Sequence, residues 1–327
     1  MKKHYLIYGL CIIVGFAVGS LYFINSGSEK TSAPNVRPGN CPYKLISPLR
    51  CGDDVPAQTE YSVFKKKLLE ELDGEVKKGK LSAAALYFRD LNNGPTFYFN
   101  EQLEFAPMSL LKLPMMIAVY KYAESNPKLL EEKLHTPSAF GKNEQVMEPS
   151  KTLSPDTDYT IDEIVRYMIV YSDNRAIDML SAWLEDKGSN YEVLRRTLSD
   201  LGIVGYEASL DASQITVKQY ASLFRILYNA SYLNAAMSEK ALAVLEESEF
   251  KEGLTGKLPN DLGVAHKFGV RAFNEGEQQL HDCGIVYFKP SPYMICIMTR
   301  GKEYKALSDY IQNASKKVFT EVSDRAQ

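Results

Sequence analysis

Residue types and motifs that mark several common functional classes are scarce in this sequence. Its 327 residues include only four histidines, and these show no metal-ligand spacing. No glycine-rich phosphate loop follows a predicted strand, so no nucleotide cofactor is indicated. The 38 Lys and Arg residues do not outnumber the 41 Asp and Glu residues, and a net charge of −3 provides no basic surface for a phosphate backbone. The sequence therefore predicts no metal, no cofactor and no nucleic acid partner.

Cysteine is also rare, with five residues in the chain. Cys41 and Cys51 end the short stretch CPYKLISPLRC, where they either close a disulfide loop in an oxidising compartment or remain free thiols; we expect the disulfide. Cys283 and Cys296 fall in predicted strands, and we expect them to be buried hydrophobic side chains rather than a second bridge. The chain is no small disulfide scaffold, because its length and 45% hydrophobic content suffice for one sizeable catalytic domain.

The N-terminus carries a long uncharged run. Lys2 and Lys3 precede residues 5–24, whose 20 residues would span about 30 Å as a helix. We predict an uncleaved membrane anchor over residues 1–25, with the lysines inside the cell and the rest of the chain outside. The alternative is a cleavable signal peptide, because small residues flank Val18. Residues 26–57, rich in Ser, Gly, Pro and Asn, are a predicted extracytoplasmic tether, and residues 58–327 are the predicted catalytic domain, which we expect to be monomeric.

The order of predicted elements in residues 58–327 indicates an α+β domain. A first amphipathic helix ends near Gly79, and two strands flank the turn Asn93-Gly94. Helices follow near 161–170, 175–186, 190–200, 216–229 and 238–247, then strands over 262–268, 281–288 and 293–300, and a final amphipathic helix. This order brings both ends of the domain onto one antiparallel sheet flanked by the terminal helices, and it leaves a separate helical lobe. A cleft between sheet and lobe is the natural place for a ligand.

The stretch FAPMSLLKLPMMIAVYKY begins a predicted apolar helix with two polar residues, Ser109 and Lys112. Side chains three apart on a helix project from the same face. A lysine amine in a cleft of low polarity loses some of its preference for the charged form, so it can accept the serine proton and make the hydroxyl a nucleophile. The same Ser-x-x-Lys spacing also starts at Ser62, Ser125 and Ser248, and a single match is usually an incidental serine beside a solvated lysine.

Two further motifs follow in an informative order. The stretch YSDNRAIDML places Ser172 and Asn174 at a helix start, although Ser, Asp and Asn are also common helix caps with no catalytic role. The stretch GVAHKFGVRAF offers Lys267 and Gly269 on a predicted strand, where a glycine permits close approach by a substrate backbone.

Together, PMSLLKLP, YSDN and AHKFG resemble the motifs of the penicillin-recognising serine acyl-enzymes, and residues 58–322 resemble the class A β-lactamase branch. The resemblance implies a two-lobed β-lactamase/transpeptidase-like fold. It also implies a nucleophilic role for Ser109, with Lys112 as its general base or proton relay. Ser172 would carry protons toward the leaving nitrogen, and Asn174 would hydrogen-bond the amide side chain of the substrate.

The resemblance further implies that Lys267 supplies positive potential for a substrate carboxylate. The backbone N–H groups of Ser109 and Val270 would form an oxyanion hole, in which one donor can be worth about 3 kcal/mol. Phe268 stands where the family usually has Thr or Ser, so a hydroxyl that helps to hold the carboxylate is missing. Arg271 could replace part of that contact, because a guanidinium binds carboxylates bidentately.

A second departure concerns deacylation. Class A enzymes use a glutamate on a long loop to activate water, and here YEASLD offers Glu207, Leu210 and Asp211 as a loose match on a shorter segment. Glu207 is either that base or a solvated glutamate in a turn. His266, His281 and Asp282 invite a protease or metal interpretation, but adjacent residues on a strand face opposite ways. We therefore expect structural histidines paired with Asp or with backbone groups.

The leading hypothesis is a membrane-anchored extracytoplasmic serine hydrolase that forms an acyl-enzyme on Ser109, with β-lactam amides as substrates. The first alternative is a carboxypeptidase or endopeptidase that acts on peptidoglycan-like stem peptides, which Phe268 and the short segment favour. The second is a binding module that senses wall fragments or drugs without turnover.

Overall fold

The computed structural model describes residues 61–92, 95–140, 146–186, 192–202, 214–272 and 276–326. The chain divides into two compact units, Met1–Val55 and Pro56–Gln327, and every described element belongs to the second. The predicted anchor, the tether and the Cys41–Cys51 bridge lie outside the described residues. Within these ranges, no helix combines the length and the apolar character that crossing a membrane would require.

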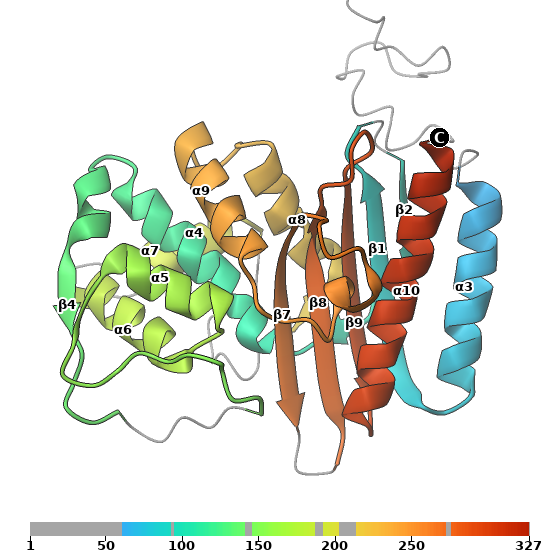
Figure 1. The fold of residues 1–327 in the computed structure, drawn as a ribbon, viewed down its shortest axis with the longest axis horizontal. Helices are drawn as coiled ribbons and strands as arrows, with labels where there is room; N and C mark the ends of the chain where they lie inside the picture. The colour runs from blue at the N-terminus through green and yellow to red at the C-terminus, as the bar shows by residue number, and fades with distance from the viewer. Residues whose placement is uncertain are drawn as a thin grey trace, which may run out of the picture. The chain divides into compact units, whose positions relative to one another are not determined.

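A five-stranded antiparallel sheet organises the second unit (Figure 1). Its order is β2-β1-β9-β8-β7, so strands from the two ends of the domain lie side by side as predicted. The bounds are β1 (Leu81–Asp90), β2 (Thr96–Phe99), β7 (Val264–Ala272), β8 (Gln278–Val286) and β9 (Tyr293–Gly301). The pairing of β1 with β2 confirms the predicted hairpin, whose turn at Asn93-Gly94 falls outside the described residues. Two short sheets pair β3 (Glu104–Phe105) with β6 (Ile215–Thr216), and β4 (Lys133–His135) with β5 (Asp158–Thr160).

The first and last helices of the unit contact each other and the sheet (Figure 1). Helix α3 (Ser62–Lys77) packs against β1, and α10 (Tyr304–Arg325) packs against β8 and β9. Both helices place apolar residues at helical spacing toward the strands, and these residues are buried. The sheet and the two helices therefore enclose one hydrophobic core, which includes Leu68, Phe88, Ile295 and Ile311.

The remaining helices lie in the predicted lobe beside β7 and on the sheet itself (Figure 1). The lobe contains α4 (Lys112–Ala123), α5 (Ile161–Val170), α6 (Asn174–Leu184), α7 (Glu192–Asp200) and α9 (Ala235–Glu246), with the short 3₁₀ turns η3 (Met108–Leu111) and η4 (Pro127–Glu131). Helix α8 (Val217–Tyr228) contacts β9, β8 and β1 of the sheet as well as α9, and the 3₁₀ turn η6 (Leu254–Lys257) packs against α10. Helix α4 lies at the centre of the lobe and contacts α5, α6, α7 and α9. Ten of its twelve residues are buried, because it is apolar on every side. Lys112, at its first position, is one of those buried residues.

Local sequence signals fix several helix starts. Thr160 at α5 and Thr216 at α8 each form a capping box with the residue three positions later, Glu163 and Gln219 respectively. Helix α5 begins and ends where the sequence predicts, at 161 and 170. The end of α5 leads directly into the segment that carries Ser172.

One prediction about cysteine is wrong. Cys283 on β8 and Cys296 on β9 are buried, as expected, but they are joined by a disulfide. The two residues lie directly opposite each other in the register of the strand pair, which brings their side chains together on one face of the sheet. The register of two strands is not visible in the sequence, so the proximity of these thiols was not predictable.

Candidate active site

Ser109 and Lys112 lie at the junction of η3 and α4. Ser109 is half-buried and lines a cavity, whereas the Lys112 side chain is almost fully buried. Met108, directly before the serine, has a backbone φ of 53°, an uncommon left-handed conformation for a residue with a side chain. The Lys112 Nζ atom lies 3.2 Å from Ser109 Oγ. The spacing of three residues therefore places hydroxyl and amine within hydrogen-bond distance, as expected.

Oxygen atoms from the next motif complete the surroundings of the Lys112 amine. Its Nζ donates to the Ser172 carbonyl oxygen, to Ser172 Oγ at 3.1 Å and to Asn174 Oδ1 at 2.6 Å. With Ser109 Oγ, four oxygens surround a group that has three protons when charged and two when neutral. The neutral amine keeps a lone pair, which can accept the proton of the Ser109 hydroxyl.

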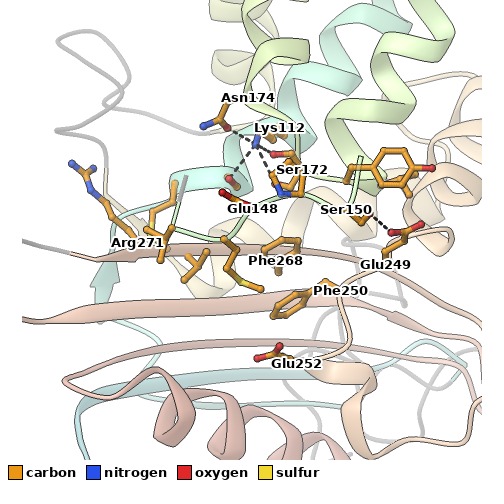
Figure 2. Close-up of a pocket in the computed structure, with 18 of the residues that line it drawn as sticks. Lys112, Glu148, Ser150, Ser172, Asn174, Glu249, Phe250, Glu252, Phe268 and Arg271 are labelled. Carbon is orange, nitrogen blue, oxygen red and sulfur yellow. Dashed lines mark hydrogen bonds between the residues drawn. The ribbon is translucent and has the colours of Figure 1, made fainter. Parts of the chain in front are cut away.

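Lys267 reaches Ser172 from the sheet. This side chain is fully buried on β7, and its Nζ donates to Ser172 Oγ and to the Phe268 carbonyl oxygen, each at 3.0 Å. Ser172 itself has a left-handed φ of 57°. The Ser172 hydroxyl thus lies between the amines of Lys112 and Lys267. Figure 2 shows the Lys112 side of this arrangement.

Burial shifts both amines toward their neutral forms. Desolvation lowers the pKa of Lys112 to about 7, although the carboxylates of Asp173 and Asp178 oppose that shift. Desolvation also lowers the pKa of Lys267 well below its ordinary value; the nearby Lys112 charge adds to this effect and Asp282 opposes it. A Lys112 amine with a pKa near 7 is available as a proton acceptor at neutral pH.

Asp173, which lies between Ser172 and Asn174, is a helix cap, which is the structural role that the sequence left open. It is the N-cap of α6, where its Oδ1 accepts from the Arg175 N–H at 2.9 Å. Its Oδ2 accepts from the Leu153 N–H at 2.8 Å, and the side chain is fully buried. The same three-residue motif therefore caps a helix through its middle residue and surrounds Lys112 through its outer two.

A cavity of about 1030 Å³ opens beside these groups. Ser109, Lys112, Ser172 and Asn174 line it on the helical side, and the β7 residues Phe268, Val270 and Arg271 line it on the sheet side. Figure 2 shows Arg271 at one end of the cavity and Glu249 with Ser150 at the other. Gly269 has a different surrounding: a Cβ on it would lie 3.1 Å from the Pro107 carbonyl oxygen and 3.2 Å from Leu110, so its close neighbour is η3. The glycine therefore allows η3, which carries Ser109, to approach β7 closely.

The two buried histidines are structural, as expected. His266 Nδ1 lies 2.9 Å from Asp282 Oδ1, across the β7–β8 pair. His281 contacts backbone groups: its Nε2 lies 3.1 Å from the Ala106 carbonyl oxygen, and its Nδ1 accepts from the Thr299 N–H. Desolvation lowers the pKa of His281 to about 4. Across the described ranges, no three His, Cys, Asp or Glu residues group as a metal site would need.

Comparison with known proteins identifies the family. A sequence profile described as the beta-lactamase enzyme family matches residues 66–322, which is most of the chain. The chain belongs to this family. The matched range contains all three motifs that surround the cavity, so the resemblance seen in the sequence is confirmed.

Individual relatives are distant in sequence and similar in fold. Beta-lactamase VEB-1 from Pseudomonas aeruginosa is 24% identical over 248 residues, which cover 72% of this chain and 82% of that protein. The crystal structure of a class A beta-lactamase from Bacteroides cellulosilyticus has a TM-score of 0.65 at 22% identity and covers 80% of this chain and 98% of its own. A PBP-A variant in an acyl-enzyme complex with penicillin G has a TM-score of 0.64 at 19% identity. The match covers 79% of this chain and 97% of the PBP-A chain. These structures confirm the predicted β-lactamase/transpeptidase-like fold.

Some residues of the site were not predicted. Tyr220 on α8 donates from its buried hydroxyl to the Leu110 carbonyl oxygen at 3.0 Å, which holds η3 in place. Phe250 stacks on Phe268 with ring centroids 3.9 Å apart. Both come from segments distant in sequence from the motifs, and a lone aromatic residue carries no sequence signal for such a contact. Glu207 lies outside the described residues, so its predicted role stays a prediction.

Proposed function

We propose that this protein is a serine hydrolase that forms an acyl-enzyme through Ser109 and hydrolyses β-lactam amides. The observation that supports it best is the placement of Lys112 Nζ, 3.2 Å from Ser109 Oγ in the wall of the cavity, with its pKa lowered to about 7. Membership of the beta-lactamase enzyme family supports the substrate class.

The contacts suggest how acylation would proceed. The neutral Lys112 amine takes the Ser109 proton while Oγ attacks the carbonyl carbon, and the developing oxyanion lies near the backbone N–H groups of Ser109 and Val270. The C–N bond then breaks, and its nitrogen receives a proton through the Ser172 hydroxyl, which Lys112 resupplies. Asn174, whose Oδ1 accepts from Lys112, is placed to bond the amide side chain of the substrate through its NH₂ group. Water, activated by Glu207 in the predicted role, would release the acyl group.

Intact-protein mass spectrometry with a penicillin tests the proposal. We expect wild-type protein to gain the mass of the drug and then to lose it, and the Ser109→Ala variant to gain nothing. The matched control is Ser125→Ala, because exposed Ser125 begins the same Ser-x-x-Lys spacing elsewhere in the chain. A folded wild type that never forms the adduct, or a Ser109→Ala variant that still forms it, would contradict the assignment.

Deacylation has a separate test. If Glu207 activates the water, Glu207→Gln should form the adduct at the wild-type rate and keep it, so steady-state hydrolysis of a chromogenic cephalosporin should fall by at least a hundredfold. Unchanged hydrolysis in this variant would remove Glu207 from the mechanism.

We also propose that residues 1–25 anchor the protein outside the cytoplasm, with residues 58–327 as the catalytic domain. The uncharged run after Lys2 and Lys3 supports this. The full-length chain should remain in the membrane fraction after alkaline carbonate extraction, and a chain that lacks residues 1–25 should not. Release of the full-length chain by carbonate would contradict the anchor.

A further inference from the structure

The turn that carries Ser109 contains an unfavourable backbone conformation. Met108 has a left-handed φ of 53°, which costs free energy in a residue with a Cβ atom and persists only where the surrounding structure fixes it. Inside the turn, the Leu110 N–H donates to the Pro107 carbonyl oxygen at 3.0 Å. This bond is local, so contacts from other elements are expected on both sides of Met108.

Two side chains of β8 bond the residue at which the turn begins. The Ala106 N–H donates to Gln279 Oε1 at 3.1 Å, and the Ala106 carbonyl oxygen lies 3.1 Å from His281 Nε2. Residues two apart on a strand project from the same face, so Gln279 and His281 meet both backbone groups of one residue. All three residues are buried, so little water competes for these bonds.

The second contact of His281 shows which ring nitrogen carries the proton. Its Nδ1 accepts from the Thr299 N–H at 3.2 Å, so Nδ1 is unprotonated. A neutral imidazole has one N–H group, which is then at Nε2 and donates to the Ala106 carbonyl oxygen. Desolvation lowers the pKa of His281 to about 4, so the ring keeps this neutral form at neutral pH.

Gly269 gives His281 access to the turn. The two residues are register partners in the β7–β8 pair, and register partners lie side by side on one face of a sheet. A Cβ on Gly269 would lie 3.1 Å from the Pro107 carbonyl oxygen, so the turn lies directly over the glycine. The side chain of His281, next to that glycine, therefore reaches the backbone of the turn.

Tyr220 bonds the other end of the turn. Its hydroxyl, on α8, donates to the Leu110 carbonyl oxygen at 3.0 Å, and both residues are buried. Side chains from β8 and α8 thus hold residues 106 and 110, on either side of Met108 and Ser109. The turn itself lines the cavity, whereas these three side chains lie behind it, outside the lining.

We propose that three residues position the Ser109 hydroxyl for acylation without touching the substrate, namely Tyr220, Gln279 and His281. This inference rests on the proposed acylation of Ser109. They fix the backbone of residues 106–110, and that backbone sets both the hydroxyl and the N–H group of Ser109. Contacts that act through the turn and not on the ligand favour the transition state of acylation and leave ground-state binding almost unchanged.

Two substitutions separate the contacts of His281. A glutamine places its amide near the Nε2 position, so His281→Gln can still donate to the Ala106 carbonyl oxygen but lacks the acceptor for Thr299. An asparagine places its amide near the Nδ1 position, so His281→Asn has the opposite contacts. At saturating penicillin we expect His281→Asn to acylate at least tenfold more slowly than wild type, and His281→Gln to stay within about threefold of wild type. The dissociation constant of the penicillin should change less than about twofold in both variants.

Both constants come from the rate of adduct formation at increasing penicillin concentration, measured by rapid-quench mass spectrometry of the full-length protein. The pH is kept above 7, where the Lys112 amine is mostly neutral. Tyr220→Phe and Gln279→Leu each remove one contact with the turn and should also lower the saturating rate with little change in binding. The matched controls are His135→Asn, an exposed residue on β4, and Tyr228→Phe, an exposed residue on α8; both should equal wild type.

The possible results separate this inference from the proposed function. If wild type forms no adduct, or if Ser109→Ala still forms it, the proposed function fails. If wild type is acylated at Ser109 but His281→Asn is no slower than His281→Gln, the inference fails alone. It also fails if the variants weaken penicillin binding and keep the saturating rate. If His281→Asn does not fold, Tyr220→Phe decides the question, because it keeps the buried ring, and an unchanged rate in that variant would overturn the inference.

Discussion

At the scale of single residues, Lys112 is the most constrained side chain of the site. An amine this buried is costly when charged, and its pKa of about 7 reflects that cost. Oxygens from Ser172 and Asn174 surround it, and Asp173 lies close enough to favour its charged form. Burial favours the neutral amine and the Asp173 charge favours the protonated amine, so Lys112 is divided between the two forms near neutral pH.

This balance predicts the pH dependence of acylation. Below pH 7 the Lys112 amine is mostly protonated and cannot accept the Ser109 proton, so the acylation rate should fall about tenfold per pH unit and should level off above pH 7. Lys112→Arg, whose guanidinium stays protonated, should lose at least a hundredfold of the rate at every pH from 5 to 9. The measurement is the penicillin acylation rate by mass spectrometry. The control is Lys128→Arg, because exposed Lys128 belongs to the Ser-x-x-Lys match that begins at Ser125; this variant should retain the wild-type dependence of the acylation rate on pH. A wild-type acylation rate that does not change with pH would contradict the role of Lys112.

At the scale of elements, the N-terminus of α6 connects helix formation with the chemistry of the site. Asp173 caps this helix and also bonds the Leu153 N–H, while its charge raises the pKa of the neighbouring Lys112 against the effect of burial. The helix start and the proton affinity of the amine therefore depend on one carboxylate.

The variant Asp173→Asn separates the two effects. Loss of the charge lowers the Lys112 pKa further, so the rise of the acylation rate should move to lower pH. Loss of one of two buried hydrogen bonds should cost about 1 to 3 kcal/mol of unfolding free energy in urea. Asp178→Asn is the comparison, because this exposed residue raises the Lys112 pKa less and caps no helix; it should give a smaller shift with little loss of stability. A shift toward higher pH in Asp173→Asn would contradict this account.

Elements with strong local signals were predictable, and contacts between distant elements were not. The helix over Ile161–Val170 has both a capping box and apolar residues at helical spacing, and it agrees with the helix predicted near 161–170. The expectation that Ser109, Lys112, Ser172 and Lys267 meet came from the family resemblance, because no local pattern places a serine between two lysines. Strand register, which joins Cys283 to Cys296, and the Phe250–Phe268 stack depend on how whole elements pack, which a single sequence does not specify.

At the scale of the whole molecule, the Cys283–Cys296 disulfide joins β8 to β9 in the middle of the sheet, within the core that the sheet shares with the helical lobe. It lies next to β7, because Cys283 is the register partner of Lys267 on that strand. The bond therefore stabilises the strand against which β7 is paired.

Removal of this bond should lower the stability of the fold. The cysteines are 13 residues apart, and a loop of this length predicts a loss of about 3 kcal/mol in Cys283→Ala with Cys296→Ala. Urea unfolding of wild type with and without a reductant provides the measurement: the reductant should destabilise wild type and leave the double variant unchanged. The comparison variant, Cys41→Ala with Cys51→Ala, tests the predicted tether bridge and should keep the response to reductant. Equal stability of wild type and the Cys283→Ala, Cys296→Ala variant would contradict the prediction.

The Arg325 guanidinium lies 4.7 Å from the centre of the Tyr61 ring, so the first and last described turns of the domain meet. Tyr61 also contacts Phe88 on β1 and Phe97 on β2, at the edge of the sheet farthest from β7. A bead, an affinity tag or a fluorescent reporter attached at the C-terminal end of α10 would thus lie on the side of the sheet away from β7, the strand that borders the cavity. Immobilised protein should accept bulky polymeric ligands as readily as protein in free solution.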